Sequence, residues 1–235
     1  MNIIECELDN GSTHWYGVGD IMNGDLEVFL NGVKEYCVKK DISFVYTDPP
    51  WTSGNCKYWR TMANRQDKNI ESFKVDYKDF LACLHNQLPL NVPLFIEGSV
   101  HTYNTLINTF KDDYENFKCF KTYYSRKPQV LTVYSNESLD ELDLNGKRDD
   151  RMMDFSFQFM HRKVVISKRY NDCGFGYKPR SPLTVLDPCV GLGGTSRMCY
   201  FFGCDFVGFD LNRSRVERTI ESLNPMIDYI GRYEV

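Results

Sequence analysis

The sequence predicts an α/β fold in which an open, mostly parallel sheet is covered by helices on both faces. Short apolar runs rich in β-branched and aromatic residues alternate along the chain with stretches whose apolar residues recur at helical spacing. Two of the short runs end in turns rich in proline or glycine, as buried strands often do. The length of 235 residues is typical of one core, so we expect a single domain over residues 1–235.

Composition narrows the class of protein. Hydrophobic residues make up 42% and charged residues 26% of the chain, and the formal net charge is −4. The sequence has no apolar run of about 18 residues and no apolar block near its start, so we expect neither a membrane span nor a secretory signal. Nine cysteines at irregular spacing are typical of a cytoplasmic protein with free thiols. No Cys-x-x-Cys or His-Glu-x-x-His pattern occurs, which argues against a metal site.

The first third of the chain predicts a helix, a buried strand and a polar loop. Apolar residues recur at helical spacing over 26–33, and the β-rich run 42–47 follows. That strand must stop at Pro49 and Pro50, because proline cannot continue a central ladder. We expect the polar stretch from there to about residue 75 to form a loop.

The rest of the chain continues the alternation and includes one antiparallel hairpin. The middle elements are helices at 77–88 and 103–110, a strand at 92–96 that ends at Glu97, and a hairpin at 117–135 with its turn around 125–128. The acidic stretch 135–150 is expected to be a short, loop-like insertion. The last elements are a helix at 151–165, strands at 183–186 and 206–209, a helix at 194–202, and a closing helix at Val216, Ile220 and Leu223. Ligands of such sheets bind beyond the carboxyl ends of the strands.

One of these strand ends carries a glycine-rich turn. Residues 187–195, Asp-Pro-Cys-Val-Gly-Leu-Gly-Gly-Thr, follow a strand and open a helix. Glycine there allows positive φ and a close backbone approach to a ligand, although such turns also arise for tight packing alone. Asp210 ends the next strand, where an acid can accept hydrogen bonds from ribose hydroxyls.

The turn lacks the fingerprints of phosphate-rich cofactors. It has no Gly-Lys-Ser/Thr ending, which excludes a P-loop. Ser196 stands where the third glycine of a dinucleotide-binding turn belongs. A cofactor with a nucleoside but no pyrophosphate remains, and S-adenosylmethionine has that chemistry.

A second strand end carries the tetrapeptide Asp48–Trp51, Asp-Pro-Pro-Trp. An exocyclic amine of adenine or cytosine is a poor nucleophile, because its lone pair is delocalised into the ring. Asp48 and the carbonyl of Pro49 would accept its two N–H groups and direct the nitrogen lone pair at a methyl donor. The face of Trp51 would stack on a base that has left its duplex. A strand-terminating turn with a core Trp is the simpler alternative.

With both segments, the chain resembles the S-adenosylmethionine-dependent amino-methyltransferases that modify adenine N6 or cytosine N4 in DNA. Residues 48–51 resemble their Asp/Asn/Ser-Pro-Pro-aromatic catalytic motif, and 187–195 resemble their Asp-Pro-Phe-x-Gly-Ser-Gly-Thr cofactor motif. The catalytic motif comes first, which is the circularly permuted order of the family's β group. The resemblance implies a Rossmann-like fold, S-adenosylmethionine as cofactor and DNA as partner, with RNA as an alternative.

The resemblance also implies roles for individual residues. It assigns catalysis to Asp48, Pro49, Pro50 and Trp51, and cofactor binding to Asp25, Asp187, Pro188, Cys189, Gly191, Gly193, Gly194, Thr195 and Asp210. The hairpin at 117–135 is similar to the hairpin of the family's base pocket. The segment 151–170 is similar to the one that packs on the methionine end of the cofactor.

The chain departs from the family pattern in several places. Cys189 and Leu192 replace the usual Phe and Ser of the cofactor motif. Trp51 is the rarer aromatic, also found in related enzymes that act on adenine in RNA, whereas Asp48 favours adenine over cytosine. The insertion at 135–150 is far shorter than a usual target-recognition domain, so we expect brief sequence recognition, or a homodimer or partner subunit that supplies it.

Several groups of basic residues are candidates for contacts with nucleic acid. Those that follow the catalytic tetrapeptide are Lys57, Arg60, Arg65 and Lys68, with Trp59 among them. A loop there would close over the flipped base and its phosphates. Basic blocks at 118–127 and 161–170 would form a positive face, in contrast to residues 1–33, which carry six acids and no Lys or Arg. An ordinary solvated surface is the alternative for all of them.

We therefore expect an enzyme that transfers a methyl group from S-adenosylmethionine to adenine N6 in DNA. Cytosine N4 in DNA and adenine in RNA are the enzymatic alternatives. A catalytically silent subunit that binds cofactor or nucleic acid is the alternative from another class. The pair Pro188-Cys189 resembles the nucleophile of cytosine C5 methyltransferases, but it lies inside the cofactor turn, which argues against that chemistry.

Overall fold

The computed structural model describes residues 2–36, 41–67, 75–124, 127–144, 153, 156–160 and 183–234. The strands are β1 (Asn2–Leu8), β2 (Thr13–Val18), β3 (Phe44–Thr47), β4 (Leu94–Ser99), β5 (Asn116–Tyr124), β6 (Lys127–Ser135), β7 (Thr184–Asp187), β8 (Asp205–Asp210) and β9 (Ile227–Glu234). The helices are η1 (Ile21–Asn23), α1 (Asp25–Tyr36), α2 (Ser53–Asp67), α3 (Tyr77–Gln87), α4 (Tyr103–Phe110), η2 (Lys111–Asp113), α6 (Gly194–Phe202), α7 (Arg213–Leu223) and η3 (Asn224–Met226).

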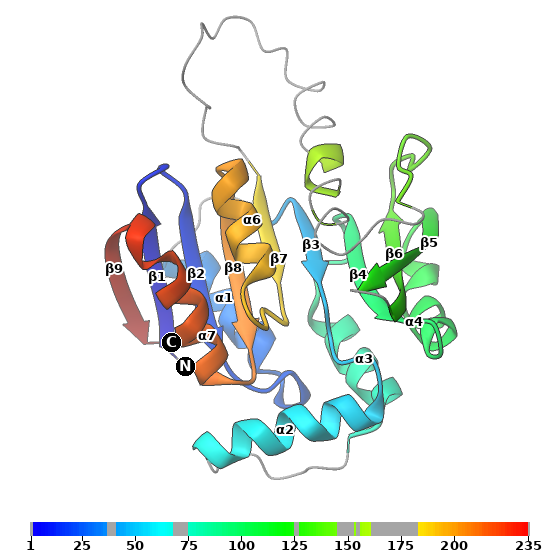
Figure 1. Cartoon of the computed structure of the whole chain (residues 1–235), viewed down its shortest axis with the longest axis horizontal. Coiled ribbons are helices and arrows are strands. Elements are labelled where there is room, and N and C mark those ends of the chain that lie inside the picture. The colour runs from blue at the N-terminus through cyan, green and yellow to red at the C-terminus, as the bar shows by residue number, and fades with distance from the viewer. Residues whose placement is uncertain are drawn as a thin grey trace, which may run out of the picture.

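The described residues form one nine-stranded sheet in the order β5-β6-β4-β3-β7-β8-β2-β1-β9 (Figure 1). The central strands β4, β3, β7, β8 and β2 are parallel to one another. Antiparallel pairs extend both edges: β6 and β5 beyond β4, and β1 and β9 beyond β2. The α/β class and the hairpin at 117–135 are confirmed, and the parallel pairing is confined to the centre of the sheet.

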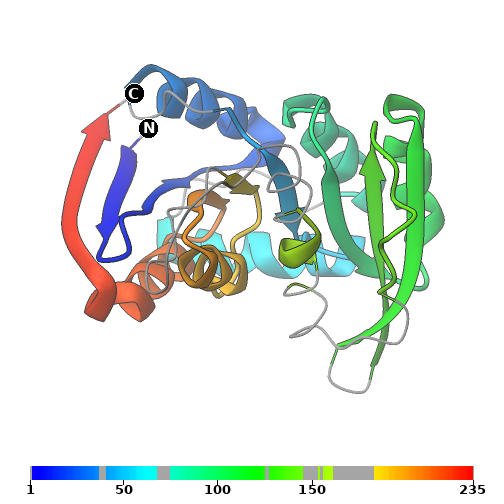
Figure 2. The same cartoon turned by 90° about the horizontal axis from the view of Figure 1, so that it is seen from above.

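Helices cover both faces of the sheet. Figure 2 shows α1, α3 and α4 on one face and α6 and α7 on the other. The strands supply both cores by alternation: Phe44 and Tyr46 of β3 face the core under α6 and α7, whereas Val45 faces the core under α1, α3 and α4. Because strands such as β3 are buried on both faces, they form short continuous apolar runs, which made them predictable from the sequence.

The expectation of a loop from the Asp-Pro-Pro-Trp tetrapeptide to about residue 75 is wrong, because Ser53–Asp67 form helix α2. Cys56, Arg60 and Ala63 are buried at helical spacing, so α2 has a buried face. Because Arg60 lies on this buried face, the helical period of apolar residues in α2 is interrupted, and the sequence indicated a polar loop. The charge of Arg60 is tolerated there because it forms an ion pair, described below.

The expectation that the chain closes with the helix at Leu223 is also wrong, because β9 follows. This strand carries Asp, Gly, Arg and Glu and exposes most of its side chains, so it lacks a clear period of two. Its hydrogen-bonding partner is β1 at the other end of the chain, where Ile3 pairs with Tyr233. Local sequence carries no signal for such a contact.

Strands β1 and β2 were not predicted either, since β1 carries two glutamates and β2 includes a buried histidine and a glycine. The other elements agree with the sequence where the structure describes them. Residues 153 and 156–160 are helical, as expected for 151–165, and the other positions of that stretch lie outside the described residues. The same is true of 145–150 in the short insertion and of the basic block 161–170. No helix among the described residues combines the length and the apolar character needed to cross a bilayer.

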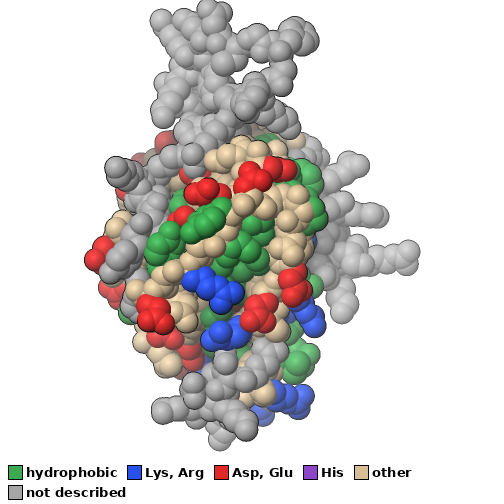
Figure 3. Space-filling model, turned by 90° about the vertical axis from the view of Figure 1, so that its left-hand side faces the viewer, with side chains coloured by type: hydrophobic (Ala, Val, Ile, Leu, Met, Phe, Trp, Pro, Cys, Tyr) green, Lys and Arg blue, Asp and Glu red, His purple; other side chains and the backbone are tan. Residues whose placement is uncertain are grey.

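The β9 side of the molecule is not a basic surface. In Figure 3 it shows apolar side chains with acidic ones around them and few basic ones. Tyr229 and Ile230 of β9 are 52% and 44% exposed. In the basic block at 118–127, Lys118 donates to the carbonyl of Leu139 at 2.6 Å, whereas Lys121 is exposed.

Candidate functional site

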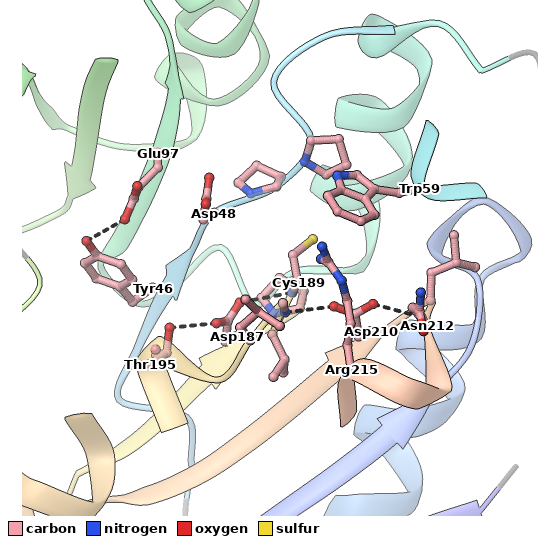
Figure 4. A pocket seen from close by; sticks show the side chains of 18 of the residues that line it. Tyr46, Asp48, Trp59, Glu97, Asp187, Cys189, Thr195, Asp210, Asn212 and Arg215 are labelled. Atoms are coloured by element: carbon pink, nitrogen blue, oxygen red, sulfur yellow. Dashed lines mark hydrogen bonds between the residues drawn. The ribbon is translucent and has the colours of Figure 1, made fainter. Parts of the chain in front are cut away.

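The carboxyl ends of the central strands open into a cavity of about 840 Å³. Helix α2 lies across this edge of the sheet (Figure 1). Residues 48–51 after β3, 187–192 after β7 and 210–212 after β8 line the cavity, so both sequence motifs face the same space (Figure 4). The volume lies within the range of small-molecule sites.

Most of the residues singled out in the sequence lie in the cavity wall. These are Asp48, Pro49, Pro50, Trp51, Asp187, Pro188, Cys189, Gly191, Gly194, Thr195 and Asp210. Gly193 is not part of the wall. It has φ of 76°, and a Cβ there would lie 2.5 Å from Cγ2 of Thr219 on α7. This glycine therefore allows close packing of α7, the alternative that the sequence left open.

Asp25 also lies outside the cavity wall. It begins α1, and its Oδ2 accepts the backbone N–H of Asp20 at 2.7 Å. Asp20 itself lines the cavity, together with Ile21. The sequence contains two Gly-Asp pairs, 19–20 and 24–25, and only the tertiary structure distinguishes the one at the cavity.

The Asp-Pro-Pro-Trp tetrapeptide is held by hydrogen bonds that the sequence did not reveal. The indole N–H of Trp51 donates to Oδ1 of Asp48 at 2.6 Å. The hydroxyl of Thr102, in the turn after β4, donates to the carbonyl of Trp51 at 2.7 Å. The carboxylate of Asp48 is exposed within this frame, while Trp51 is half-buried.

Glu97 is a cavity residue that sequence reasoning named only as the end of a strand. Thr47 of β3 pairs with Ile96 of β4, so Asp48 and Glu97 follow at the same level of adjacent parallel strands (Figure 4). Glu97 is 4% exposed, and its Oε1 accepts the hydroxyl of Tyr46 at 2.9 Å. Burial, and then the charge and hydrogen bond of Glu97, raise the pKa of Tyr46 well above its ordinary value.

Asp187 fastens the glycine-rich turn. Its Oδ1 accepts the backbone N–H of Cys189 at 3.0 Å, and its Oδ2 accepts the hydroxyl of Thr195 at 2.7 Å. Burial raises the pKa of Asp187 to about 7, and these two donors only partly oppose that effect. The side chain thus ties the start of the turn to the first turn of α6.

Asp210 connects the same turn to the next strand. Its Oδ2 accepts the N–H of Gly191 and its Oδ1 accepts the N–H of Asn212, each at 2.8 Å. Burial raises the pKa of Asp210, and the two N–H groups and the charge of Arg215 act in the opposite direction. The ends of β7 and β8 are therefore fixed relative to each other at the cavity.

Two contacts attach α2 to the opposite wall of the cavity. Arg60 forms a buried ion pair with Asp20, Nη1 to Oδ2 2.6 Å. The guanidinium of Arg215 lies 3.5 Å from the centroid of the Trp59 ring, a cation–π contact. Arg60 is therefore not available to phosphates, contrary to expectation. Lys57 and Arg65 of α2 are exposed, and Lys68 lies outside the described residues.

The thiols of the cavity wall are poorly suited to act as nucleophiles. Burial, with the nearby charges of Asp187 and Asp210, raises the pKa of Cys189 well above its ordinary value. Burial also raises the pKa of Cys56 to about 11. Among the residues that the structure describes, no set of three or more His, Cys, Asp or Glu side chains is arranged to hold a metal ion.

Comparison with known proteins gives a likeness of fold. No protein-family model and no curated protein matches the chain. The crystal structure of the M1.HpyAVI complex with S-adenosylmethionine has a TM-score of 0.50 at 13% identity, covering 90% of this chain and 99% of that one. TTHA0409 of Thermus thermophilus, complexed with S-adenosylmethionine, gives 0.45 at 12% identity, with 92% and 95% covered. PvuII DNA methyltransferase, cytosine-N4-specific, gives 0.46 at 11% identity, with 88% and 85% covered. The chain shares the fold of M1.HpyAVI.

Proposed function

We propose that this chain transfers a methyl group from S-adenosylmethionine to the N6 amine of adenine in DNA. The observation that carries the proposal is that the Asp-Pro-Pro-Trp turn, the glycine-rich turn and Asp210 all line one cavity. The shared fold supports the same cofactor here, because the M1.HpyAVI structure is a complex with S-adenosylmethionine. The resemblance of residues 48–51 to the catalytic motif of amino-methyltransferases supports the reaction.

The walls of the cavity fit this cofactor. Each oxygen of Asp210 accepts one backbone N–H, and a carboxylate oxygen has two lone pairs, so acceptor capacity remains for two ribose hydroxyls. Gly191 has φ of 57°, and a Cβ there would meet no atom closer than Nη1 of Arg215 at 3.7 Å, so its backbone is open to a ligand. Besides the Asp20–Arg60 ion pair and the buried Asp187, whose pKa of about 7 keeps it partly protonated at neutral pH, the wall carries Asp48, Glu97 and Asp210 against Arg197 and Arg215. When bound, S-adenosylmethionine supplies a methyl group on a positively charged sulfur, which this excess of acid would favour.

The other end of the cavity would hold the base. A carboxylate oxygen of Asp48 accepts one N–H of the amine and the carbonyl of Pro49 accepts the other, so the lone pair of the nitrogen turns toward the methyl carbon. As the nitrogen–carbon bond forms, the electron pair of the carbon–sulfur bond stays on sulfur. The nitrogen releases one proton, which Asp48 accepts. The face of Trp51 stacks on the base and offsets part of the stacking lost from the duplex.

The nucleic acid would approach the edge of the sheet at which α2 lies. Lys57 and Arg65 expose positive charge on this helix, close in sequence to the catalytic turn, whereas the β9 side of the molecule is rich in acid (Figure 3). The short insertion at 135–150 leaves little chain for reading a target sequence. Sequence recognition is therefore brief or shared with a second subunit.

Two other enzymatic targets and one non-enzymatic role are the alternatives. Cytosine N4 presents the same kind of amine next to a ring nitrogen, and adenine in RNA differs only in its backbone. The Asp at position 48 favours adenine, by the resemblance to the family. A silent cofactor-binding subunit has no need of an intact Asp48, so retention of this carboxylate in the cavity favours the enzyme.

The deciding experiment is incubation with methyl-labelled S-adenosylmethionine and unmethylated DNA, RNA or no nucleic acid, followed by digestion and mass spectrometry of the nucleosides. We expect label in N6-methyladenine from DNA. Label in N4-methylcytosine, or only from RNA, would replace the target by one of the alternatives. Saturable cofactor binding with no methylated nucleoside from any substrate would establish the silent subunit.

Asp48→Ala tests the role of the carboxylate. We expect kcat to fall by roughly 100-fold or more, as for loss of one preorganised polar group, while the Kd for S-adenosylmethionine changes little. Asp228→Ala, at an exposed position of β9 outside the cavity wall, is the matched control for loss of one Asp carboxylate. Turnover of Asp48→Ala equal to that of the control would refute the assigned role.

A further inference from the structure

Trp51 contacts Asp48 through the edge of its ring, not through its face. Its Nε1–H donates to Oδ1 of Asp48 at 2.6 Å, a short distance typical of a bond to a charged acceptor. The proposed function uses the face of this ring to stack on the base. The N–H at the ring edge is a separate chemical feature, and stacking does not require it.

The donor is itself held in place. Pro49 and Pro50, which precede Trp51, each have a fixed φ angle and so restrict the backbone. The carbonyl of Trp51 accepts the hydroxyl of Thr102 at 2.7 Å. Thr102 belongs to the turn between β4 and α4, outside the cofactor half of the cavity. Contacts therefore run from a fixed turn through Trp51 to the Asp48 carboxylate.

An exposed Asp side chain ordinarily samples several rotamers, and the angle at which it accepts an amine N–H changes with each of them. The bond from Trp51 restricts Asp48 to one arrangement. Phe has no donor at this place, and the hydroxyl of Tyr lies at the far end of its ring, so neither supplies the same bond from the same backbone.

We propose that Trp51 is a positioning residue, whose indole N–H fixes the Asp48 carboxylate in the orientation that accepts the target amine. This role rests on the proposed function and is separate from stacking. The ring face contributes to binding of the base, whereas the ring edge contributes to the rate of the chemical step. Positioning and stacking thus predict different kinetic signatures.

The hydrogen bond itself is tested without turnover, by NMR of the protein in the absence of cofactor. The chain has three Trp, so its ¹H–¹⁵N spectrum contains three indole signals, which Trp→Phe variants assign. We expect Asp48→Asn to move the Trp51 signal upfield and to leave the Trp15 signal in place. Trp15 provides the matched control, because its Nε1–H donates to Oε2 of Glu5 at 2.6 Å, and Glu5→Gln should move only that signal. A Trp51 signal that does not respond to Asp48→Asn would overturn the proposal.

The kinetic test compares Trp51→Phe, which keeps an aromatic face, with Trp51→Leu, which loses it. For Trp51→Phe we expect kcat to fall by roughly 10- to 100-fold, the cost of a misplaced catalytic group, with the Kd for DNA within about threefold of the parent. Trp51→Leu should weaken DNA binding as well. An unchanged or higher kcat in Trp51→Phe would overturn the positioning role.

One further variant keeps the test decisive. Thr102→Val leaves the tetrapeptide intact, and we expect kcat to fall in it too, because the frame that holds Trp51 is loosened. If Trp51→Phe fails to fold, an unchanged kcat in Thr102→Val would overturn the proposal. Absence of any methylated nucleoside with the parent protein contradicts the proposed function instead, and the NMR result stands apart from it.

Discussion

Asp187 is a buried carboxyl group whose charged form the fold disfavours. Burial is the main cause, and it raises the pKa from 3.8 to about 7 despite donors from Thr195 and Cys189. The folded protein therefore holds a proton on Asp187 at pH values where the unfolded chain has already released it. The stability from this group is complete below about pH 4 and is lost as the pH rises toward 7.

Asp187→Asn tests this pH dependence, because Asn keeps the size and an acceptor oxygen but does not titrate. We expect the unfolding free energy of the parent, relative to that of the variant, to fall by about 2–4 kcal/mol between pH 4 and pH 7.5. Urea unfolding of both proteins at several pH values measures it. Parallel pH dependences would show that Asp187 titrates normally in the folded state.

The residues of the two motifs could be read from the sequence, because their backbone demands are local. Proline after Asp48 and glycine after Asp187 mark turns whatever surrounds them. Asp20 and Glu97 could not be assigned in this way. Asp20 precedes η1 and Glu97 lies within β4, and only the pairing of distant strands and loops brings these acids to the cavity.

At the level of elements, α2 depends on one ion pair across the cavity. Arg60 and Asp20 are 6% and 7% exposed, so removal of one partner leaves a buried charge without compensation. Together with the Trp59–Arg215 contact, the pair holds α2 against the walls that carry η1 and α7. The helix that follows the Asp-Pro-Pro-Trp turn is thus fixed to the segment before α1.

Arg60→Met tests this connection. We expect it to lower the free energy of unfolding by about 3–5 kcal/mol, because Asp20 is then buried and unpaired. The double variant Arg60→Met with Asp20→Asn should recover much of that loss, since no buried charge remains. Chemical denaturation measures both, and equal losses in the single and double variants would argue that the charge pair is not the source of stability.

Strands β3, β4, β7 and β8 and the helices packed on them were predictable because each shows an apolar face to a core. The sequence did not reveal β1 and β2, which mix apolar residues with Glu, His and Gly. It also failed at α2, where an arginine occupies a buried position, and at β9, an edge strand with mostly exposed side chains. In both cases a partner far along the chain stabilises the element. The hydrophobic period of a sequence indicates which side chains are buried in the core. It does not indicate which residues form ion pairs or which strands pair in the sheet.

At the scale of the whole molecule, the proposed cofactor would bridge the ends of several strands and so stabilise the fold. We expect S-adenosylmethionine at about 100 times its Kd to add about 2.7 kcal/mol, and to raise the Tm by roughly 5–10 °C. A single domain over 1–235 predicts one unfolding transition with and without the ligand.

Asp210→Asn tests the source of this shift, because it weakens acceptance of the ribose hydroxyls. Asp228→Asn, at an exposed position of β9, is the matched control. We expect the ligand-induced shift to shrink in the first and to persist in the second. Differential scanning calorimetry measures the transition and its shift. An equal shift in all three proteins would remove Asp210 from the cofactor site.

The sequence by itself determined the α/β class, strands β3, β4, β7 and β8 with the helices packed on them, and the two turns that carry Asp48 and the glycines, because these features follow from local backbone geometry and from burial period. Only the tertiary structure decided that both turns share one cavity, that Asp20 and Glu97 join them, that Gly193 serves packing against α7, and that Trp51 donates to Asp48. Each of these depends on the register and direction of elements remote in the chain, and such contacts leave no periodic trace in the residues that make them.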